Sequence, residues 1–440
     1  MKQDSRGIFL NLVSFSLPLV LSGVLQQLYQ WADAFIVGNV EGELALAAVG
    51  STTSITNLAV TVITGFCLGL SILLAQRFGE GRRDEMRRIL SSFSFLLALV
   101  FIIAAALGTL FTRQILTLMN TTADTIDLAE DYLSIVFSGV PFLAVYNVFS
   151  AVLRSCGNSR APFYAVLVSS AVNVILDVVF IAVLGWSVSG AAAATVISQA
   201  AMTVYLVIYT VVRYPWLRFR PGRRMLDAGC AAQGLSIGLP PMLQSSVTSI
   251  GSLILQNFMN GFGTATVAAI TSAYRIDTIV MLPIVNLSSG ISTLVAQSRG
   301  ALRRDECSRI FSCGLVLMTA VSLLLTVIVI PTGGWLIALF GAGEEACAIG
   351  SAFFLRLASF YIVFGLANAI RGYIEGMGDV RFSSLAGIIS LLVRIAGSYA
   401  MRPLFGNMVI AWAEALAWCL LLAMYIVRIP HAGRLLRGAA

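Results

Sequence analysis

Two polar side chains stand four residues apart inside an apolar run that extends from about residue 162 to residue 184. Asn173 and Asp177 therefore share one face of the predicted helix. Asp33 lies in a second apolar run, between Ser14 and Val40. A carboxylate inside hydrocarbon costs roughly 3 kcal/mol or more, so acids at such positions usually face a cavity. Two acids that face the same pocket could bind a cation.

The two acids and Thr195 are predicted to lie at one depth. Asp33 is eight residues before the acidic loop at Glu41, and Asp177 is eight residues before the turn at Gly185. Thr195 is nine residues after the end of that same turn. At about 1.5 Å of rise per residue, all three lie roughly 12 Å in from the outer surface.

These side chains offer only oxygen ligands, which suit a hard cation such as Na+. A proton fits as well, because two desolvated carboxylates disfavour each other's ionised form and one can then bind and release H+ near neutral pH. We predict that the coupling ion, H+ or Na+, binds at Asp33, Asn173, Asp177 and Thr195. The alternative is that Asn173 and Asp177 only hydrogen-bond neighbouring helices, and that Thr195 bonds to its own helix.

The first helix extends this polar face. Gln26, Tyr29 and Asp33 are at i, i+3 and i+7, so they line one stripe, and Asn147 on the fourth helix is expected to face the same space. We predict that Gln26, Tyr29 and Asn147 line a substrate cavity. Pro18 lies about four turns before Asp33, and a proline permits a kink. A bend there would move the whole stripe; a static kink is the alternative.

The composition predicts the class of protein that must position these residues. Of 440 residues, 58% are hydrophobic and only 11% are charged, and the mean hydropathy is +0.90. Soluble domains carry about 25% charged residues, so this is an all-α polytopic membrane protein. Apolar runs predict about twelve transmembrane helices, at residues 10–38, 44–77, 89–112, 129–154, 161–184, 188–213, 231–260, 264–297, 308–332, 347–371, 382–403 and 407–428.

Several functions find no support in the sequence. The net charge of +7 is spread over short loop clusters without a basic, aromatic face, so we expect no nucleic-acid partner. The seven cysteines form no CxxC pair and the single histidine, His431, lies in the basic tail, so we expect no metal centre and no cofactor. No nucleophile and base pair up, so we do not expect an enzyme.

The loops predict the orientation. Arginine clusters follow the even-numbered helices, whereas the loops after odd-numbered helices are acidic, with few basic residues. By the positive-inside rule, both termini and all even-numbered loops are cytoplasmic.

The chain contains an internal repeat. Residues 75–89 read AQRFGEGRRDEMRRI and residues 296–310 read AQSRGALRRDECSRI, an offset of 221 (297 − 76, for Gln76 and Gln297). Each half has six helices, an even number, so the halves are parallel repeats, as in one class of secondary transporter. We predict an N-terminal six-helix lobe at 1–211, a cytoplasmic linker at 212–228 and a C-terminal six-helix lobe at 229–440.

The acidic residues are not repeated. At the same offset Asp33 falls on Ile254, and Asp177 falls on a serine. We predict that Arg394 and Glu414, at similar depth in the second half, form a structural ion pair, with substrate contact as the alternative. The second half carries charged residues within its predicted helices, among them Arg275, Asp277, Arg356, Arg394 and Glu414.

Seven segments match the pattern of one known family: QQLYQWADAFIVGN (26–39), LAQRFGEG (74–81), LRSCGNSRAP (153–162), NVILD (173–177), SGAAAATVIS (189–198), LVAQSRGA (294–301) and IEGMGDVR (374–381). Together these segments resemble the multidrug and toxic compound extrusion (MATE) transporters, in the DinF-like prokaryotic branch. The resemblance covers essentially the whole chain and implies two six-helix bundles and the export of lipophilic, often cationic compounds driven by Na+ or H+.

The resemblance also implies roles for single residues. The first-lobe cation site of that branch looks like Asp33, Asn173, Asp177 and Thr195. Pro18 looks like the proline at which the first helix bends, and the neighbouring cavity residues look like Gln26, Tyr29 and Asn147. The other bacterial branch carries an acidic cation site in its second lobe, but the seventh helix here reads PPMLQSSV, without an acid.

We therefore predict a cation-coupled antiporter that exports amphipathic, often cationic drugs or toxic compounds by alternating access through a cavity between two lobes. The alternative is a flippase for a lipid-linked oligosaccharide or another lipid, a relative of similar build. The second-half arginines favour that alternative, because a pyrophosphate needs basic groups. We expect a monomer in the bacterial inner membrane.

Overall fold

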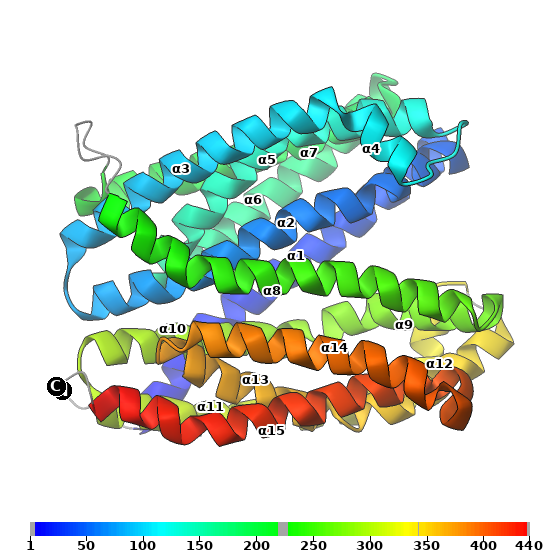
Figure 1. Cartoon of the computed structure of the whole chain (residues 1–440). Coiled ribbons are helices and arrows are strands. Elements are labelled where there is room, and N and C mark those ends of the chain that lie inside the picture. The colour runs from blue at the N-terminus through cyan, green and yellow to red at the C-terminus, as the bar shows by residue number, and fades with distance from the viewer. Residues whose placement is uncertain (1–4, 219–227, 342, 438–440) are drawn as a thin grey trace. The chain divides into compact units, whose positions relative to one another are not determined.

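A computed structural model describes residues 5–218, 228–341 and 343–437 of the chain. Every regular element in this described part is a helix, which confirms the predicted all-α fold (Figure 1). The helices of the first half are α1 (Ser5–Glu41), α2 (Glu43–Gly79), α3 (Arg83–Leu110), α4 (Thr112–Leu118), α5 (Ile126–Ser155), α6 (Arg160–Asp177), the π-helix η1 (Val178–Val183), α7 (Ser187–Arg213) and the short 3₁₀-helix η2 (Pro215–Leu217).

The second half repeats this order with different breaks. Its helices are α8 (Ala228–Asn260), α9 (Thr264–Val280), α10 (Leu282–Gly300), α11 (Arg304–Ala338), α12 (Glu344–Ala358), α13 (Tyr361–Gly376), α14 (Val380–Phe405), η3 (Gly406–Met408) and α15 (Val409–Arg437). The predicted helix 264–297 is divided at Met281, where Pro283 cannot donate a helical hydrogen bond. The predicted helix 347–371 is bent by 46° where α12 meets α13.

Nine helical runs in the described ranges are long and apolar enough to cross a membrane, and the bent pair α12–α13 makes a tenth. The run Val380–Gly433 is counted once there but contains both α14 and α15, and α8 falls outside that count. With these two additions the helices correspond to the twelve predicted segments.

Contacts between residues divide the chain into two compact units. We name Leu21–Met242 the N-unit, and Met1–Val20 together with Leu243–Ala440 the C-unit. Helices α1 and α8 thus each change unit part-way along, and the two points correspond within one residue across the repeat (20 + 221 = 241). The predicted lobe boundaries, which follow the sequence halves, stay a prediction; residues 219–227 of the predicted linker lie outside the described residues.

Proline marks both of these points. Pro18 lies two residues before Val20 ends the first segment of the C-unit, and Pro240 and Pro241 lie just before Met242 ends the N-unit. Each proline leaves a carbonyl of the preceding turn without its helical hydrogen bond, which permits a bend.

One helix is central in each unit. In the N-unit α5 packs against α2, α3 and α7, which run beside it in Figure 1. In the C-unit α13 packs against α10, α11 and α15. A Cβ atom added to Gly372 or Gly376 of α13 would lie only 2.5 or 2.7 Å from the carbonyl oxygens of Ser288 and Ser292 on α10. Small residues at i and i+4 therefore allow these two helices to approach closely.

The repeat is also visible in the backbone. Left-handed φ angles recur at the offset of 221, with 86° at Gly42 and 87° at Gly263. Two pairs differ in residue type: Gly81 (74°) is matched by Leu302 (57°), and Asn120 (56°) is matched by Gly341 (73°). The remaining pairs are Gly157 with Gly378 and Gly185 with Gly406. A duplicated backbone thus carries two different sets of side chains.

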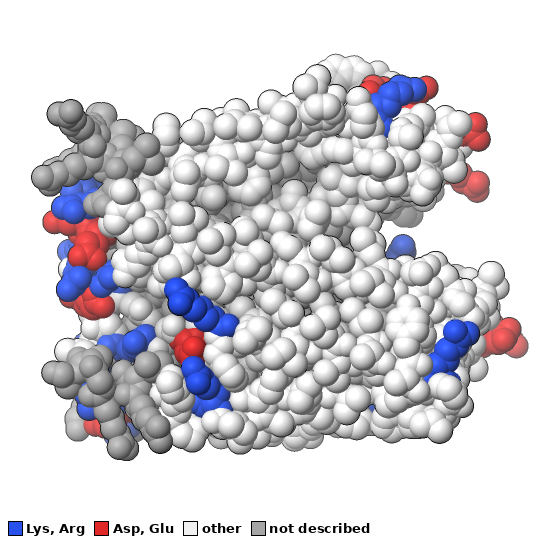
Figure 2. Space-filling model, viewed as in Figure 1, with Lys and Arg blue, Asp and Glu red and all other residues white. Residues whose placement is uncertain are grey.

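On the face shown in Figure 2, charged side chains gather toward the ends of the helices and the surface between them is almost wholly uncharged. Large apolar side chains are exposed along the helices, among them Leu99, Ile102 and Ile103 on α3 and Leu324 and Val327 on α11. An apolar exposed band bounded by charge is typical of helices that face lipid.

The pair Gly81 and Leu302 gives a test of backbone strain. A left-handed conformation costs a residue with a side chain roughly 1–2 kcal/mol. We expect Gly81→Leu to lower the thermal unfolding midpoint by about 2–8 °C, and Leu302→Gly to leave it unchanged or raise it. Size-exclusion chromatography of the detergent-solubilised protein after heating measures both midpoints. Equal losses in the two variants would contradict the strain at Leu302.

Candidate cation site

The chain leaves the regular α-helix directly after Asp177. Asp177 ends α6, and in the π-helix that follows the amide of Leu184 donates to the carbonyl of Val179, five residues back (2.9 Å). Such π-turns are rare and often occur at functional sites. The corresponding stretch around Ser398 in α14 is α-helical throughout. The π-turn therefore belongs to the half of the chain that carries the intramembrane acids.

Asn173 and Asp177 are buried without partners. They are 1% and 0% exposed, and neither the amide atoms of Asn173 nor the carboxylate oxygens of Asp177 make a hydrogen bond to a described residue. The buried Oδ1 atom of Asp33 on α1 is likewise unpartnered there. Leaving a buried polar group unpaired costs about 1–3 kcal/mol, and more when it is charged. The alternative that both residues bond neighbouring helices is therefore wrong for the described part of the chain.

The two carboxylates lie in one region of the N-unit. Asp33 is within electrostatic range of Asp177, and both acids are within electrostatic range of Tyr132, which is buried on α5. Tyr29, about one turn before Asp33 on α1, is within electrostatic range of the same tyrosine. Two like charges shielded from water repel each other, so a bound cation or proton would relieve the repulsion.

An apolar cluster lies one turn nearer to the end of α1 at Glu41, and we name it the outer apolar cluster because the loop charges predict that this end faces outward. Val37 follows Asp33 by four residues and Ile181 follows Asp177 by four, and both belong to this cluster. Its residues on α7 include two that precede Thr195 by three and four positions. The buried members are Val37, Ala45, Tyr132, Val136, Ile181, Val188, Ala191 and Ala192. Elements α1, α5, η1 and α7 thus meet directly outside the acids and shield them from the outer end of the unit.

The other predicted residues differ in how they are held. The half-buried hydroxyl of Thr195 makes no hydrogen bond to a described residue, so the alternative of back-bonding is not observed there. The amide of Asn147 donates to the carbonyl of Leu143 on its own helix (2.9 Å). Gln26 is half-buried on α1, and Pro18 lies within an unbroken helix. Their roles as cation ligands, cavity residues and bend stay predictions.

Tyr132 was not predicted from the sequence. It stands next to the exposed Asp131 at the outer end of α5. Aromatic residues at helix ends are common at the membrane interface, so their sequence position gives no signal of contact with buried acids. Only the packing of α5 in the N-unit brings Tyr132 within electrostatic range of Asp33 and Asp177.

The C-unit treats its buried charges differently. Arg394 donates from Nη2 to Glu414 Oε2 (2.9 Å) and to the hydroxyl of Tyr274 (2.7 Å), which confirms the predicted ion pair. The carboxylate of Asp277 accepts a hydrogen bond from the hydroxyl of Tyr361 (2.6 Å). These acids, unlike those of the N-unit, have partners within their own unit.

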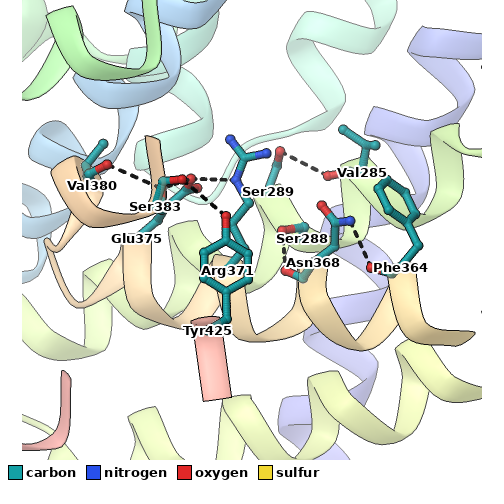
Figure 3. Close-up of polar contacts among 10 residues, drawn as sticks. All are labelled: Val285, Ser288, Ser289, Phe364, Asn368, Arg371, Glu375, Val380, Ser383 and Tyr425. Atoms are coloured by element: carbon teal, nitrogen blue, oxygen red, sulfur yellow. Dashed lines mark hydrogen bonds and ion pairs between the residues drawn. The ribbon is translucent and has the colours of Figure 1, made fainter. Parts of the chain in front are cut away.

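A second network joins α13, α14 and α15 (Figure 3). Arg371 Nε lies 2.7 Å from Glu375 Oε1, and the hydroxyl of Ser383 donates to the same oxygen (2.6 Å). The hydroxyl of Tyr425 donates to the carbonyl of Ser383 (3.2 Å). Glu375 is only 3% exposed, and the guanidinium of Arg371 balances its charge.

No group of three or more His, Cys, Asp or Glu side chains that could hold a metal ion occurs within the described ranges. The polar centre of the N-unit is therefore a pair of carboxylates with neutral oxygen donors. Such a set suits a hard monovalent cation or a proton better than a soft transition metal.

Comparisons with known proteins agree with this class of molecule, a polytopic membrane protein built from two similar halves. The MatE family model matches residues 18–179 and 240–400, so the same family pattern occurs once in each half. The chain belongs to the MatE family, and the resemblance to MATE transporters is confirmed. The DinF-like branch stays a prediction.

Relatives and solved structures extend over nearly the whole chain. The chain is 28% identical to the probable multidrug resistance protein YoeA of Bacillus subtilis, over 89% of this chain and 86% of that protein. It is 25% identical to the multidrug export protein MepA of Staphylococcus saprophyticus, over 96% and 94%. An outward-facing structure of a multidrug resistance MATE family transporter of the MOP superfamily matches with a TM-score of 0.89 at 19% identity, over 99% and 98% of the two chains. A MATE in complex with MaD5 matches with a TM-score of 0.90 at 19% identity, with the same coverage.

The unpartnered atoms of Asn173 predict an effect on stability. Asn173→Leu removes two desolvated polar atoms, so we expect the thermal midpoint in Na+-free buffer to rise by about 2–4 °C for each kcal/mol regained. Differential scanning fluorimetry of the purified protein measures this. Asn147→Leu is the matched control, because its amide already has a hydrogen-bond partner in Leu143. A midpoint that falls as far in Asn173→Leu as in the control would contradict the unpartnered state of Asn173.

Proposed function

We propose that this protein is a cation-coupled antiporter of the cytoplasmic membrane that exports amphipathic, often cationic compounds by alternating access. In this proposal both termini lie in the cytoplasm, and the substrate is transported without chemical change. The relatives named above as multidrug resistance and export proteins support the substrate class.

One observation carries the proposal: the carboxylate of Asp177 is fully buried beside Asp33 with no partner among the described residues. An ionised carboxylate in that position is too costly to persist alone, so a bound H+ or Na+ neutralises it. Asp33 supplies a second acid, and Asn173 and Thr195 supply neutral oxygens.

Export against a gradient requires that this neutralisation be linked to movement. Inward passage of one cation provides about 2.3 kcal/mol per 100 mV of membrane potential. Gln26 and Tyr29 share a stripe of α1 with Asp33, so loading of the acids changes the surroundings of the residues assigned to the substrate cavity. If no single conformation binds both the cation and the substrate, then the inward movement of the cation is coupled to the outward movement of the substrate.

The first test is ethidium efflux from membrane vesicles under separately imposed Na+ and H+ gradients. We expect one gradient to drive efflux by the wild-type protein. Asp33→Asn and Asp177→Asn should lose at least about nine-tenths of this efflux, because an amide has no negative charge for the cation to neutralise. A tenfold loss corresponds to about 1.4 kcal/mol. Asp131→Asn, an exposed acid on α5, is the control that retains efflux.

Full gradient-driven efflux by correctly inserted Asp177→Asn would remove the central assignment. Absence of efflux under either gradient in the wild-type protein would favour the alternative of a lipid-linked oligosaccharide flippase. Transport of such a lipid in reconstituted vesicles then distinguishes the two functions.

Pro18 is proposed as the bend of α1, since the helix changes unit two residues later. Pro18→Ala restores a helical hydrogen bond and stiffens α1. We expect efflux to slow about tenfold, a barrier increase near 1.4 kcal/mol, while Na+- or pH-dependent thermal stabilisation of the purified protein stays as in wild type. Loss of the stabilisation together with efflux would place Pro18 in the binding site itself and not in the coupling.

A further inference from the structure

The C-unit contains a pocket of about 660 Å³ near its outer end, and an arginine lines it. The end of α8, the helix α9 and the segment that follows α11 surround the pocket, and the described lining includes no acidic residue. The residues used below are Asn260, Thr264, Thr271, Ser272, Arg275 and Phe340.

The polar wall is one face of α9. Thr264, Thr271 and Arg275 are at i, i+7 and i+11, so they share a stripe that points into the pocket. Asp277 is two residues further and points to another face, where it accepts its hydrogen bond from Tyr361. The stripe therefore presents hydroxyl groups toward the mouth and a guanidinium at its inner end, without a compensating carboxylate.

Arg275 differs from the other membrane-depth arginines of the C-unit. Arg371 and Arg394 are ion-paired to acids, and Arg356 donates to the carbonyl of Ala352 (2.7 Å). Arg275 is exposed and has no hydrogen bond or ion pair to any described residue. The hydroxyls of Thr271 and Ser272, within one turn of it, are also without a partner among these residues.

An unpaired charge at the membrane depth of Arg275 is costly in free energy. It stands twelve residues inward from the turn at Gly263, about 18 Å along the helix at 1.5 Å per residue. Ionisable residues at such depth are rare and mark substrate pathways. A guanidinium also presents a planar fork of donors that matches a carboxylate or a phosphate with two parallel hydrogen bonds.

We propose that this pocket binds the anionic group, a carboxylate or a phosphate, of an amphipathic substrate. Arg275 forms the bidentate contact, and the hydroxyls of Thr271 and Ser272 donate to the remaining oxygens. Asn260 and Thr264 line the mouth, and the ring of Phe340 contacts the apolar part of the molecule. The repeat offset places Ser54 at the equivalent position of the first half (275 − 221 = 54), so the anion site belongs to the C-unit alone. This inference rests on the proposed transport function and extends its substrates to zwitterionic and anionic amphiphiles.

A pair of dyes with one xanthene core tests the proposal. Rhodamine 19 carries a carboxylate, and rhodamine 6G carries the ethyl ester in its place. We expect Arg275→Gln to weaken equilibrium binding of rhodamine 19 to the purified protein at least tenfold and to change that of rhodamine 6G less than twofold. Arg275→Lys should retain part of the preference, because it keeps the charge but loses the fork.

Arg356→Gln is the matched control, since it removes an arginine of the same unit whose side chain bonds its own helix. Fluorescence polarisation in detergent measures all four proteins and needs no ion gradient. Equal weakening of both dyes by Arg275→Gln, or no weakening of rhodamine 19, overturns the anion site. If the wild type exports neither dye in vesicles, the transport proposal fails; if it exports both with unchanged selectivity in Arg275→Gln, only this inference fails.

A competition experiment distinguishes the sources of the anion. Short-chain dihexanoyl phosphatidylglycerol either displaces rhodamine 19 from the wild-type protein, which assigns the site to a phospholipid headgroup as well, or leaves it bound, which assigns the site to carboxylate compounds. In the first case the displacement must be lost in Arg275→Gln. Displacement that is equal in wild type and variant overturns a role of Arg275 in binding the headgroup.

Discussion

The N-unit depends on a carboxylate that its own side chains do not neutralise. Asp177 is placed in the interior by the end of α6, by the π-turn η1 and by the outer apolar cluster that lies beyond it. Folding such a group costs free energy, because water is removed and no donor replaces it. Stability is thus sacrificed at this position, as is common at functional sites. In the proposed function it is the position at which the coupling ion binds and leaves. The surrounding helices, packed on α5, provide the rigid frame that keeps the site in place.

The comparison between the two halves separates structure from function. The same left-handed turns recur at an offset of 221, and the order of the helices repeats with different breaks. Where the N-unit leaves Asp33 and Asp177 without partners, the C-unit pairs Glu414 with Arg394 and bonds Asp277 to Tyr361. One backbone therefore carries a set of acids suited to a cation in one unit and a set of balanced charges in the other.

The long helices α1 and α8 connect these units in an unusual manner. Each begins in one unit and ends in the other, with prolines close to the point of change. A bent helix must keep its backbone hydrogen bonds on both sides of the bend, and a proline confines the loss of hydrogen bonding to one turn. In α1 the segment beyond that point carries Gln26, Tyr29 and Asp33, so a single element connects the point of change with the acid.

The sequence by itself determined the class of fold, the twelve helices, the repeat and the family, because hydropathy, loop charge and duplication are properties of order along the chain. It also identified Asp33, Asn173 and Asp177 as polar residues inside membrane helices, because a polar residue in an apolar run is conspicuous without any structure. The pairing of Arg394 with Glu414 followed from depth alone. Only the tertiary structure decided that Tyr132 lies within electrostatic range of the acids, that the helix changes to a π-turn after Asp177 and that α1 and α8 are divided between units. Those features depend on which helix faces pack together, and the apolar residues that form lipid-facing and buried surfaces are chemically alike.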